Sequence, residues 1–568
     1  MSTSRRPIIA LWALFFITPC FTTNILDYWI ATDLIALSAA LFSAAWMYRQ
    51  PSSSHQTIHI VSWVLFLLFL CPVFLHLLMH DAANPWSLIK SSIYITAVFL
   101  IFHLSRNSAQ QLIQNTAWVR LLAWVAHLYI AIGIAQSFHL FSEDQHSLFA
   151  IWSYFSDFVG PLLQRNLNTL FLLLVVAALW LQSIRNTWSK RWLLASLFPC
   201  SVIIFSNSRA ALLLLAGLFF TVLILHRHRK SVVVHLFPLL AASVAIAMLG
   251  QFGLQHITDS ITPLGSRLAE AGITARLNIW YSAILMFLEH PWIGVGAGNF
   301  SSHFADFQGQ ALAQHPDWYE MDGSTYWSHN IILQFFSEGG ILGGIFILAI
   351  FIIIGQRIMH ILKSPNPLQH PHALAAISLT LLLLHGLVSI SLMQGFFLAL
   401  FGLYLAALFP PKAPALDTSS AHNIIAILPA LYLAFTCYQY IHTQTKLRIV
   451  FDDNPDSPRF ISQVTQAIEN PWLSRSGMEY LFVNMDMTHA PAWQWVQLYP
   501  YLYTYWQLNQ EPTALKRLIL QAHLADNPLS EAHLATIYAH DFPKNAWNKK
   551  IQQHIHGGHQ RHEALDMQ

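Results

Sequence analysis

Three arginines and one histidine have the chemistry needed to handle a phosphorylated substrate at a membrane surface. Arg165 lies in "GPLLQRNLNT", Arg209 in "FSNSRAALL" and Arg276 in "ITARLNIW". A guanidinium is planar and donates two parallel hydrogen bonds, which suits phosphate and pyrophosphate oxygens. His329, in "STYWSHNIILQFF", carries an imidazole that accepts a proton when it is neutral. These residue types predict a pyrophosphate-binding site that includes a base.

Each of the four residues also has a simpler interpretation. An arginine at the mouth of a membrane helix commonly extends its charged head to the interface. The chain has 30 histidines, so any one of them is most simply an interfacial residue. The combination carries the prediction, because neighbouring arginines disfavour an imidazolium and would keep His329 neutral.

The elements that must position these residues are membrane helices. The chain has 568 residues, of which 55% are hydrophobic and 10% are charged, whereas about 25% are charged in a soluble domain. Apolar runs long enough to cross a bilayer recur along it, so we predict an all-α, polytopic membrane protein of about thirteen transmembrane helices. The predicted spans lie near 7–24, 29–47, 58–78, 86–104, 118–139, 166–184, 191–206, 209–226, 231–250, 338–356, 371–391, 394–410 and 423–442.

The distribution of cations predicts the orientation. Lys and Arg gather on connections such as "HRHRK" at 226–230, which the positive-inside rule assigns to the cytoplasm together with the N-terminus. The loop 251–337 and the tail 443–568 then face the periplasm of a bacterial inner membrane. The three arginines and the histidine introduced above all fall on this outer side, against the rule, so a function should favour them there.

The chain is expected to comprise two domains. Residues 1–442 form the transmembrane domain, with the periplasmic loop 251–337 inserted in it. Residues 443–568 form a small periplasmic domain, which we predict to be helical because "SPRFISQVTQAIEN" and "SEAHLATIYAHD" combine helical periodicity with N-cap signals.

Signals for nucleotide, metal and disulfide chemistry are weak. "GVGAGNF" at 294–300 follows no strand and lacks the lysine of a P-loop, which favours a flexible turn. Asp452, Asp453 and Asp456 in "FDDNPD" favour an Asx/Pro turn over a metal site. The four cysteines lie in apolar runs and are expected to be buried side chains. We therefore expect no cofactor, no metal in the chemistry and no nucleic-acid partner; membrane lipids surround the chain.

Four elements, in this order, resemble the bacterial O-linked oligosaccharyltransferases that glycosylate pilins and belong with the O-antigen ligases and polymerases. The elements are "QRN" at 164–166, "NSRAALL" at 207–213, "RLNIWYSAILMFLEHPWIGVGAGNF" at 276–300 and "SHNIILQFFSEGG" at 328–340. The resemblance implies a GT-C-like membrane fold. It also implies transfer of a whole glycan from undecaprenyl pyrophosphate to a Ser or Thr hydroxyl of a periplasmic, pilin-like protein.

The resemblance further implies a role for each matching residue. Arg209 and Arg276, joined by Arg165, would bind the pyrophosphate of the donor. His329 would be the general base, or an orienting group, for the acceptor hydroxyl. The residues expected to position donor or acceptor are Gln164, Asn330 and Glu338.

The acceptor and the class of protein have alternatives. Relatives that modify proteins often carry an acidic residue and a tyrosine after the histidine that matches His385, whereas this chain has Ser389 and Ile390 near those positions. This departure indicates a divergent subgroup. An O-antigen ligase acting on lipid A core and an O-antigen polymerase therefore stay open, although the long tail favours a protein acceptor. A lipid or solute transporter is the alternative of another class, but it would place ionisable groups near the bilayer midplane.

Overall fold

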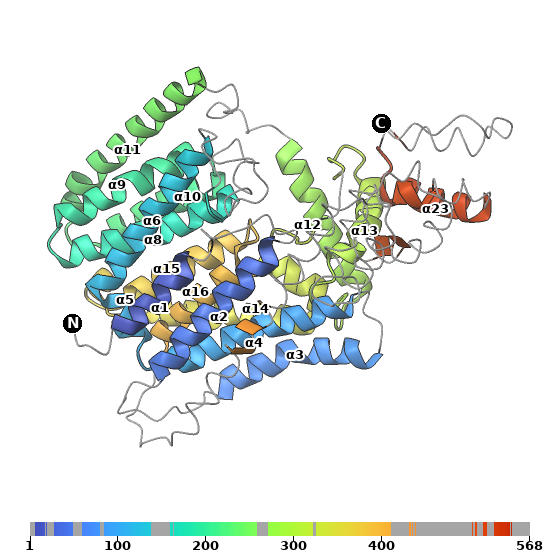
Figure 1. Ribbon diagram of the computed structural model, residues 1–568, viewed down its shortest axis with the longest axis horizontal. Helices are drawn as coiled ribbons and strands as arrows, with labels where there is room; N and C mark the ends of the chain where they lie inside the picture. Colours follow the sequence, from blue (N-terminus) through green and yellow to red (C-terminus); the bar gives the residue numbers. More distant parts are fainter. Residues whose placement is uncertain are drawn as a thin grey trace. The chain divides into compact units, whose positions relative to one another are not determined.

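The computed structural model of the protein is built of helices (Figure 1). It describes residues 6–17, 19, 28–48, 60–79, 84–137, 160–162, 164–257, 271–321, 325–410, scattered positions between 431 and 519, 528–545 and 547. No β-strand occurs in these described ranges, in agreement with the predicted all-α class. The main helices are α1 (Arg6–Ile17), α2 (Tyr28–Tyr48), α3 (Ile60–Met79), α4 (Pro85–Ser105), α5 (Ala109–Gln114), α6 (Thr116–Ser137), α8 (Arg165–Arg185), α9 (Lys190–Phe205), α10 (Arg209–Leu225), α11 (Arg229–Ile257), α12 (Ala271–Glu289), α13 (Ser301–Gln314), α14 (Ile331–Leu362), α15 (Ala373–Gly386), α16 (Gly395–Leu408) and α23 (Pro528–Asp541).

The contacts of the chain divide it into two compact units, each made of three segments. Unit 1 comprises Met1–Phe66, Tyr94–Leu268 and Ala349–Gln439. Unit 2 comprises Leu67–Ile93, Ala269–Leu348 and Tyr440–Gln568. Helices α3, α4 and α14 therefore contribute residues to both units.

Helix α8 is the centre of unit 1. Its whole apolar stretch is buried, and α6, α9, α10 and α15 pack around it (Figure 1). A helix that is apolar on all faces is stable only where other helices cover every face. The end residues of α8 are Arg165 and Arg185, and they are only partly buried, so the position of this helix fixes where these two charges emerge.

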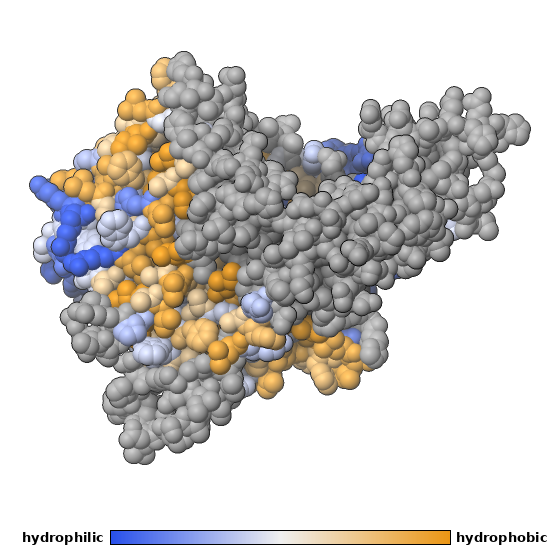
Figure 2. Space-filling model, viewed as in Figure 1, coloured by the Kyte–Doolittle hydropathy of each residue, from blue (hydrophilic) through white to orange (hydrophobic). Residues whose placement is uncertain are grey.

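The outer helices of unit 1 expose large apolar side chains, as a lipid-facing surface must. Leu213 and Phe220 of α10 are 75% and 55% exposed, and Val234 and Phe237 of α11 are 66% and 63% exposed. Figure 2 shows hydrophobic residues over much of the coloured surface. Among the described residues, six helices are long and apolar enough to span a membrane and five shorter apolar helices accompany them. The polytopic fold is thus confirmed, while the count of thirteen stays a prediction, because the expected span 423–442 lies largely outside the described residues.

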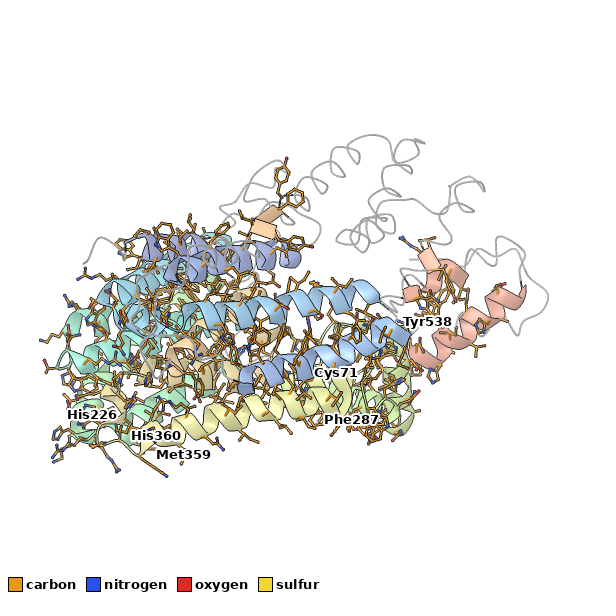
Figure 3. The ribbon with its side chains drawn as sticks, turned by 90° about the horizontal axis from the view of Figure 1, so that it is seen from below. Cys71, His226, Phe287, Met359, His360 and Tyr538 are labelled. Atoms are coloured by element: carbon orange, nitrogen blue, oxygen red, sulfur yellow. The ribbon has the colours of Figure 1, made fainter. Side chains whose placement is uncertain are left out.

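The two ends of α8 differ in their surroundings. At its C-terminal end the Arg185 guanidinium donates a hydrogen bond to the His370 carbonyl at 3.1 Å. Burial lowers the pKa of His370, and so do the positive charges of Arg357, His360 and Arg185. Figure 3 shows the labelled His360 at one end of the helices. Because Arg165 and Arg185 are the two ends of the 21-residue helix α8, which is about 30 Å long, Arg165 emerges far from this group of cations.

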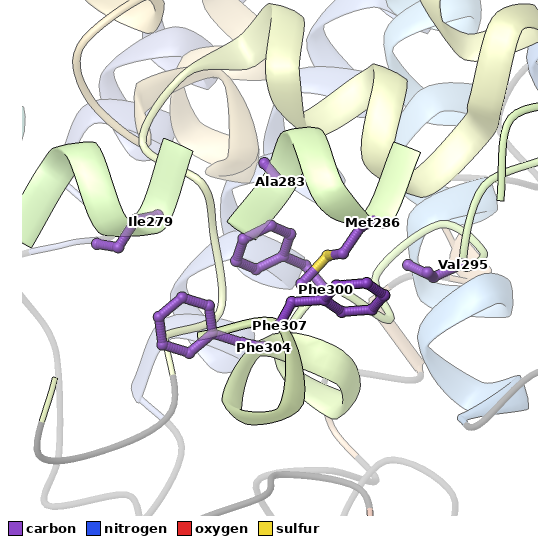
Figure 4. Packing of buried hydrophobic residues seen from close by; sticks show 7 residues of the cluster. All are labelled: Ile279, Ala283, Met286, Val295, Phe300, Phe304 and Phe307. Carbon is purple, nitrogen blue, oxygen red and sulfur yellow. The ribbon is translucent and has the colours of Figure 1, made fainter. Parts of the chain in front are cut away.

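Unit 2 is built around the antiparallel pair α12 and α13. Apolar residues from both helices and the turn that joins them form its core (Figure 4); they are Ile279, Ala283, Met286, Val295, Phe300, Phe304 and Phe307. Polar links join the same helices, since Asn278 Nδ2 donates to Gln308 Oε1 at 3.2 Å. Helix α12 ends at Glu289, two residues before Pro291.

Helix α14 is continuous in the sequence pattern but broken in the structure. Gly340 has φ 58° and ψ −148°, a conformation that is essentially restricted to glycine. At this break the Ile341 N–H donates to the Pro291 carbonyl at 2.8 Å. The residues from Ile331 to Gly339 form a separate helical piece that precedes the break. The predicted span 338–356 crosses the break, and the helix after it continues to Leu362.

The C-terminal tail contributes one well-described helix, α23. Its residues 530–541 are the "SEAHLATIYAHD" segment, so the helix predicted there is confirmed. Helix α23 packs against α13 within unit 2 (Figure 1). The other predicted helix of the tail, "SPRFISQVTQAIEN", lies outside the described residues.

Candidate functional site

The turn that precedes α8 is held in a single conformation. Gly160 has φ +71°, and a Cβ at this position would overlap the side chain of Asn168. The Gly160 N–H donates to Gln136 Oε1 on α6 at 2.7 Å. Gln164 then takes the N-cap position of α8 and Arg165 is the first helical residue. The local backbone therefore fixes where the predicted Gln164 and Arg165 lie.

Arg209 has the same position on α10 that Arg165 has on α8. Ser208 is the N-cap residue of α10, and its side chain accepts the Ala211 N–H. The same Ser208 hydroxyl donates to Asn166 Oδ1 at 2.8 Å. This bond joins the first turns of α8 and α10, so the two arginines emerge from adjacent helix N-termini at one end of unit 1.

Two adjacent helix N-termini with an arginine on each form a strongly positive region. The N-terminus of a helix carries a partial positive charge, and cations there are unfavourable. The same geometry favours anions, because unpaired backbone N–H groups point outward. Arg209 is exposed and Arg165 is partly exposed, so both guanidinium groups are accessible to a phosphate group. The arrangement suits the anion-binding role that the sequence predicts for them.

His329 lies in a short, strongly hydrogen-bonded turn of unit 2. Its φ is 56°, which a residue with a side chain adopts at a cost of about 1–3 kcal/mol. The Ser328 hydroxyl donates to the Asn330 carbonyl at 2.8 Å. Asn330 Oδ1 accepts the N–H groups of Ile332 and Leu333 at 3.0 and 3.2 Å and so caps α14. Asn330 thus has a structural role in addition to the substrate-positioning role predicted from the sequence.

Gln334 connects this turn to Glu338. Gln334 Oε1 accepts the Ser328 N–H at 2.6 Å, and Gln334 Nε2 donates to Glu338 Oε1 at 2.8 Å. The "SHN" and "EGG" ends of the motif are therefore one hydrogen-bonded unit. The backbone on one side of His329 is tied to a carboxylate that lies two helical turns away.

The glycine-rich turn 294–298 encloses the Glu338 carboxylate. Its three glycines, Gly294, Gly296 and Gly298, have φ of 70°, 94° and 77°. The Glu338 carboxylate accepts backbone N–H groups from Gly298 and Phe300, and the Gly296 N–H donates to the Glu338 carbonyl at 2.9 Å. Backbone N–H groups that converge on one oxygen-bearing group in this way resemble an anion-binding nest. Here the anion is a side chain of the protein itself, so the turn is fixed against α14 and is not a phosphate loop.

The His329 imidazole is electrically neutral over the physiological pH range. Burial lowers its pKa to about 4, and the positive charge of Arg276 contributes to the same shift. Arg276 lies on α12 and is partly exposed. No hydrogen bond joins the His329 ring to any residue within the described ranges. Its nitrogens are thus available to a hydroxyl, beside a guanidinium that can bind an anion.

The predicted site residues fall into two groups. Gln164, Arg165 and Arg209 come together in unit 1. Arg276, His329, Asn330 and Glu338 come together in unit 2. Glu338 is enclosed by backbone N–H groups and Gln334, so its clearest function is to position the turn that carries His329.

Several positioning residues were missed by the sequence analysis. Gln136, Asn166 and Ser208 connect α6, α8 and α10, and Gln334 fixes the His329 turn. The i, i+4 spacing of Gln334 and Glu338 was a usable signal. The partners of Gln136 and Ser208 lie on other helices, so spacing along the chain does not reveal them.

The acidic segment 451–456 and the turn that holds Ser389 are two further regions that the sequence singles out. Asp452, Asp453 and Asp456 lie outside the described residues, and the turn predicted for them stays a prediction. Ser389 is buried. A carboxylate does reach the next turn from another helix, since Asp33 Oδ1 accepts the Gly395 N–H at 2.6 Å.

Comparison with known proteins identifies the segment that holds most of these residues. A family profile described as O-antigen ligase matches residues 193–348. No curated protein matches the chain. The matched segment includes Arg209, Arg276, His329 and the Glu338 carboxylate, but not Arg165. Over this segment the chain is similar to the O-antigen ligase family, and its long apolar helices are those of a multi-pass membrane protein.

Proposed function

We propose that the protein transfers a glycan as one block from undecaprenyl pyrophosphate to a Ser or Thr hydroxyl of a periplasmic protein. The observation that carries the proposal is the neutral His329 imidazole beside Arg276, inside the segment that matches the O-antigen ligases. A neutral imidazole accepts a proton from a hydroxyl, and a guanidinium binds a phosphate oxygen. The reaction needs both groups.

The proposed step is a single displacement at the anomeric carbon. The acceptor oxygen attacks C1 of the first sugar while the bond from C1 to the pyrophosphate oxygen breaks. His329 receives the proton of the hydroxyl. The electron pair of the broken bond stays with the leaving undecaprenyl pyrophosphate, whose added negative charge is stabilised by Arg276.

The arginine pair supports the donor class. Arg165 and Arg209 extend from joined helix N-termini, where an anion is favoured by the helix dipoles as well as by the guanidinium groups. Such donors typically lower a transition-state barrier by a few kcal/mol each. A metal ion has no step in this mechanism, and the enzyme is proposed to be metal-independent.

The second candidate is an O-antigen ligase that uses lipid A core as its acceptor. The family match favours it, because the matched profile is that of O-antigen ligases. The chemistry at His329 is the same for either acceptor, since both present a hydroxyl. The difference lies in the acceptor surface, for which the C-terminal region provides a protein-binding candidate.

The acceptor is tested in cells that make one lipid-linked glycan. The chain is expressed together with a pilin-like periplasmic protein, and both that protein and lipid A core are analysed by intact mass. A glycan-sized mass increase on the protein, lost in His329→Ala, is expected. Glycan on lipid A core alone would replace the proposal with the ligase, and accumulation of longer lipid-linked glycan would replace it with the polymerase.

A further inference from the structure

The end of α23 lies very close to α13 within unit 2. Gly309 of α13 faces this end, and a Cβ at Gly309 would overlap the His540 carbonyl. Glu320, beyond α13, accepts the Lys544 N–H at 2.5 Å. Glycine is needed at position 309 because the two backbones meet there, so the contact between α13 and the tail is specific.

Three potential metal ligands converge at this contact. His540 Nδ1 lies 3.0 Å from Asp541 Oδ1 and 3.5 Å from Asp306 Oδ1. Asp306 is on α13, whereas His540 and Asp541 end α23. One ligand atom from each residue lies within 4.8 Å of the other two. Asp306 is far from His540 and Asp541 in the sequence, so the spacing along the chain gave no signal for this cluster.

The charges of the cluster formed by Asp306, His540 and Asp541 favour binding of a cation. The Asp541 side chain is only 4% exposed, and its Oδ1 is hydrogen-bonded to His540 Nδ1 at 3.0 Å, as a buried carboxylate requires. Two carboxylates, those of Asp306 and Asp541, converge on one imidazole, so the acidic groups of the cluster outnumber its basic group. A divalent ion would balance them.

The distances also fit a metal centre. Zinc binds His nitrogen and carboxylate oxygen at about 2.0–2.2 Å in a tetrahedral arrangement, which puts neighbouring ligand atoms about 3.4 Å apart. The observed separations of 3.0 and 3.5 Å bracket that value. An imidazole ligand argues against calcium and magnesium, which prefer all-oxygen sites. About half of the Asp306 and His540 side chains is exposed, which leaves room for water as the fourth ligand.

We propose that Asp306, His540 and Asp541 bind a divalent transition-metal ion of the zinc class, which fastens the C-terminal helix α23 to α13. This site is separate from the transfer chemistry and does not depend on the proposed function. Phe300, the N-cap residue of α13, donates its N–H to Glu338, and Gln308 of α13 is hydrogen-bonded to Asn278 of α12. The ion would therefore attach the tail to the helices that carry Arg276 and hold the His329 turn.

The test is metal binding by the purified full-length chain in detergent, stripped with EDTA and titrated with zinc chloride against a competing chromophoric chelator. We expect one site with a dissociation constant below about 1 µM. Asp306→Asn and His540→Ala should each weaken it at least tenfold. Asp306→Asn keeps the side-chain shape at a half-exposed position, so it should leave the fold intact.

His533→Ala is the matched control, because His533 is an exposed histidine on the same helix. It should leave the site unchanged. Zinc should also slow proteolytic release of the C-terminal region in the wild type and in His533→Ala, but not in Asp306→Asn. Absence of a tight site, or equal affinity in the wild type and His540→Ala, would overturn the proposal and assign any binding to other surface histidines.

Discussion

The amide of Gln334 donates to the carboxylate of Glu338 at 2.8 Å, and this one bond connects both ends of the histidine motif. The other end of the Gln334 side chain accepts the Ser328 N–H, beside His329. Glu338 is itself held by backbone N–H groups of the glycine-rich turn. The position of the imidazole thus depends on a chain of polar contacts that ends in the core of unit 2.

Gln334→Ala should lower the rate of glycan transfer more than it weakens donor binding. The change removes the acceptor for Ser328 N–H and a donor to Glu338, so the left-handed turn at His329 loses its support. A misplacement of about 1 Å costs on the order of 100-fold in rate, and we expect kcat to fall about 10–100-fold. Gln356→Ala, an exposed glutamine on the same helix, is the control. Equal rates for the two variants would show that Gln334 has no positioning role.

Gly340→Ala should destabilise the protein, whereas Gly339→Ala should not. Gly340 has a glycine-only backbone conformation, and a Cβ there would overlap the backbone of Trp292. Backbone strain and overpacking each cost about 1–3 kcal/mol. At Gly339 nothing lies within 4 Å of an added Cβ. Thermal unfolding in detergent should show a lower apparent Tm for Gly340→Ala alone; a Tm unchanged from the wild type would contradict the break in α14.

The pH dependence of transfer should reflect the lowered pKa of His329. Since burial and Arg276 lower this pKa to about 4, the imidazole stays neutral as pH falls through its ordinary value of 6.5. The wild-type kcat/KM should therefore be nearly constant between pH 7.5 and about 5.5.

The Arg276→Gln variant tests whether the positive charge of Arg276 lowers the pKa of His329. Removing the positive charge favours the imidazolium, so the pKa of His329 should rise towards 6.5, although burial still opposes protonation. The absolute rate will fall as well, but the informative quantity is the position of the acid limb, which should move to higher pH. An unchanged limb would mean that His329 does not limit the pH profile.

Arg209 should act through the two parallel hydrogen bonds that its guanidinium can donate, and not through its charge alone. Arg209→Ala should lower kcat about 100- to 1,000-fold, as removal of a donor to a developing anion does, and Arg209→Lys should recover only part of that loss. Arg120→Ala, an exposed arginine of α6, is the control and should keep full activity. If Arg209→Lys were as active as the wild type, Arg209 would contribute only its positive charge.

The sequence was most informative where a signal is local. Apolar runs predicted the helices well, and α2, α8 and α10 begin and end within one or two residues of the predicted spans, because helix length and hydropathy are properties of contiguous residues. Arg165 and Arg185 are the two ends of one buried helix, as the predicted span 166–184 implies.

Contacts between distant segments could not be predicted in this way. "GVGAGNF" is predicted as a flexible turn, but the side chain of Glu338, some 40 residues further along the chain, accepts the N–H groups of Gly298 and Phe300. The break at Gly340 was hidden because a double glycine in an apolar run is also compatible with an unbroken helix. Asp306 and His540 lie close together only because the tail folds against α13, so the sequence alone did not reveal their contact.

The most direct test of the account measures transfer by purified His329→Ala and His329→Gln with a defined lipid-linked glycan and a hydroxyl-bearing acceptor. His360→Ala, which changes an exposed histidine in the cation group at the end of α8, is the control. Loss of a general base costs about 100- to 10,000-fold, so both His329 variants should lose transfer to that extent while still binding donor, and the control should match the wild type. Transfer by His329→Ala at the wild-type rate would contradict the central claim that this imidazole accepts the proton of the acceptor.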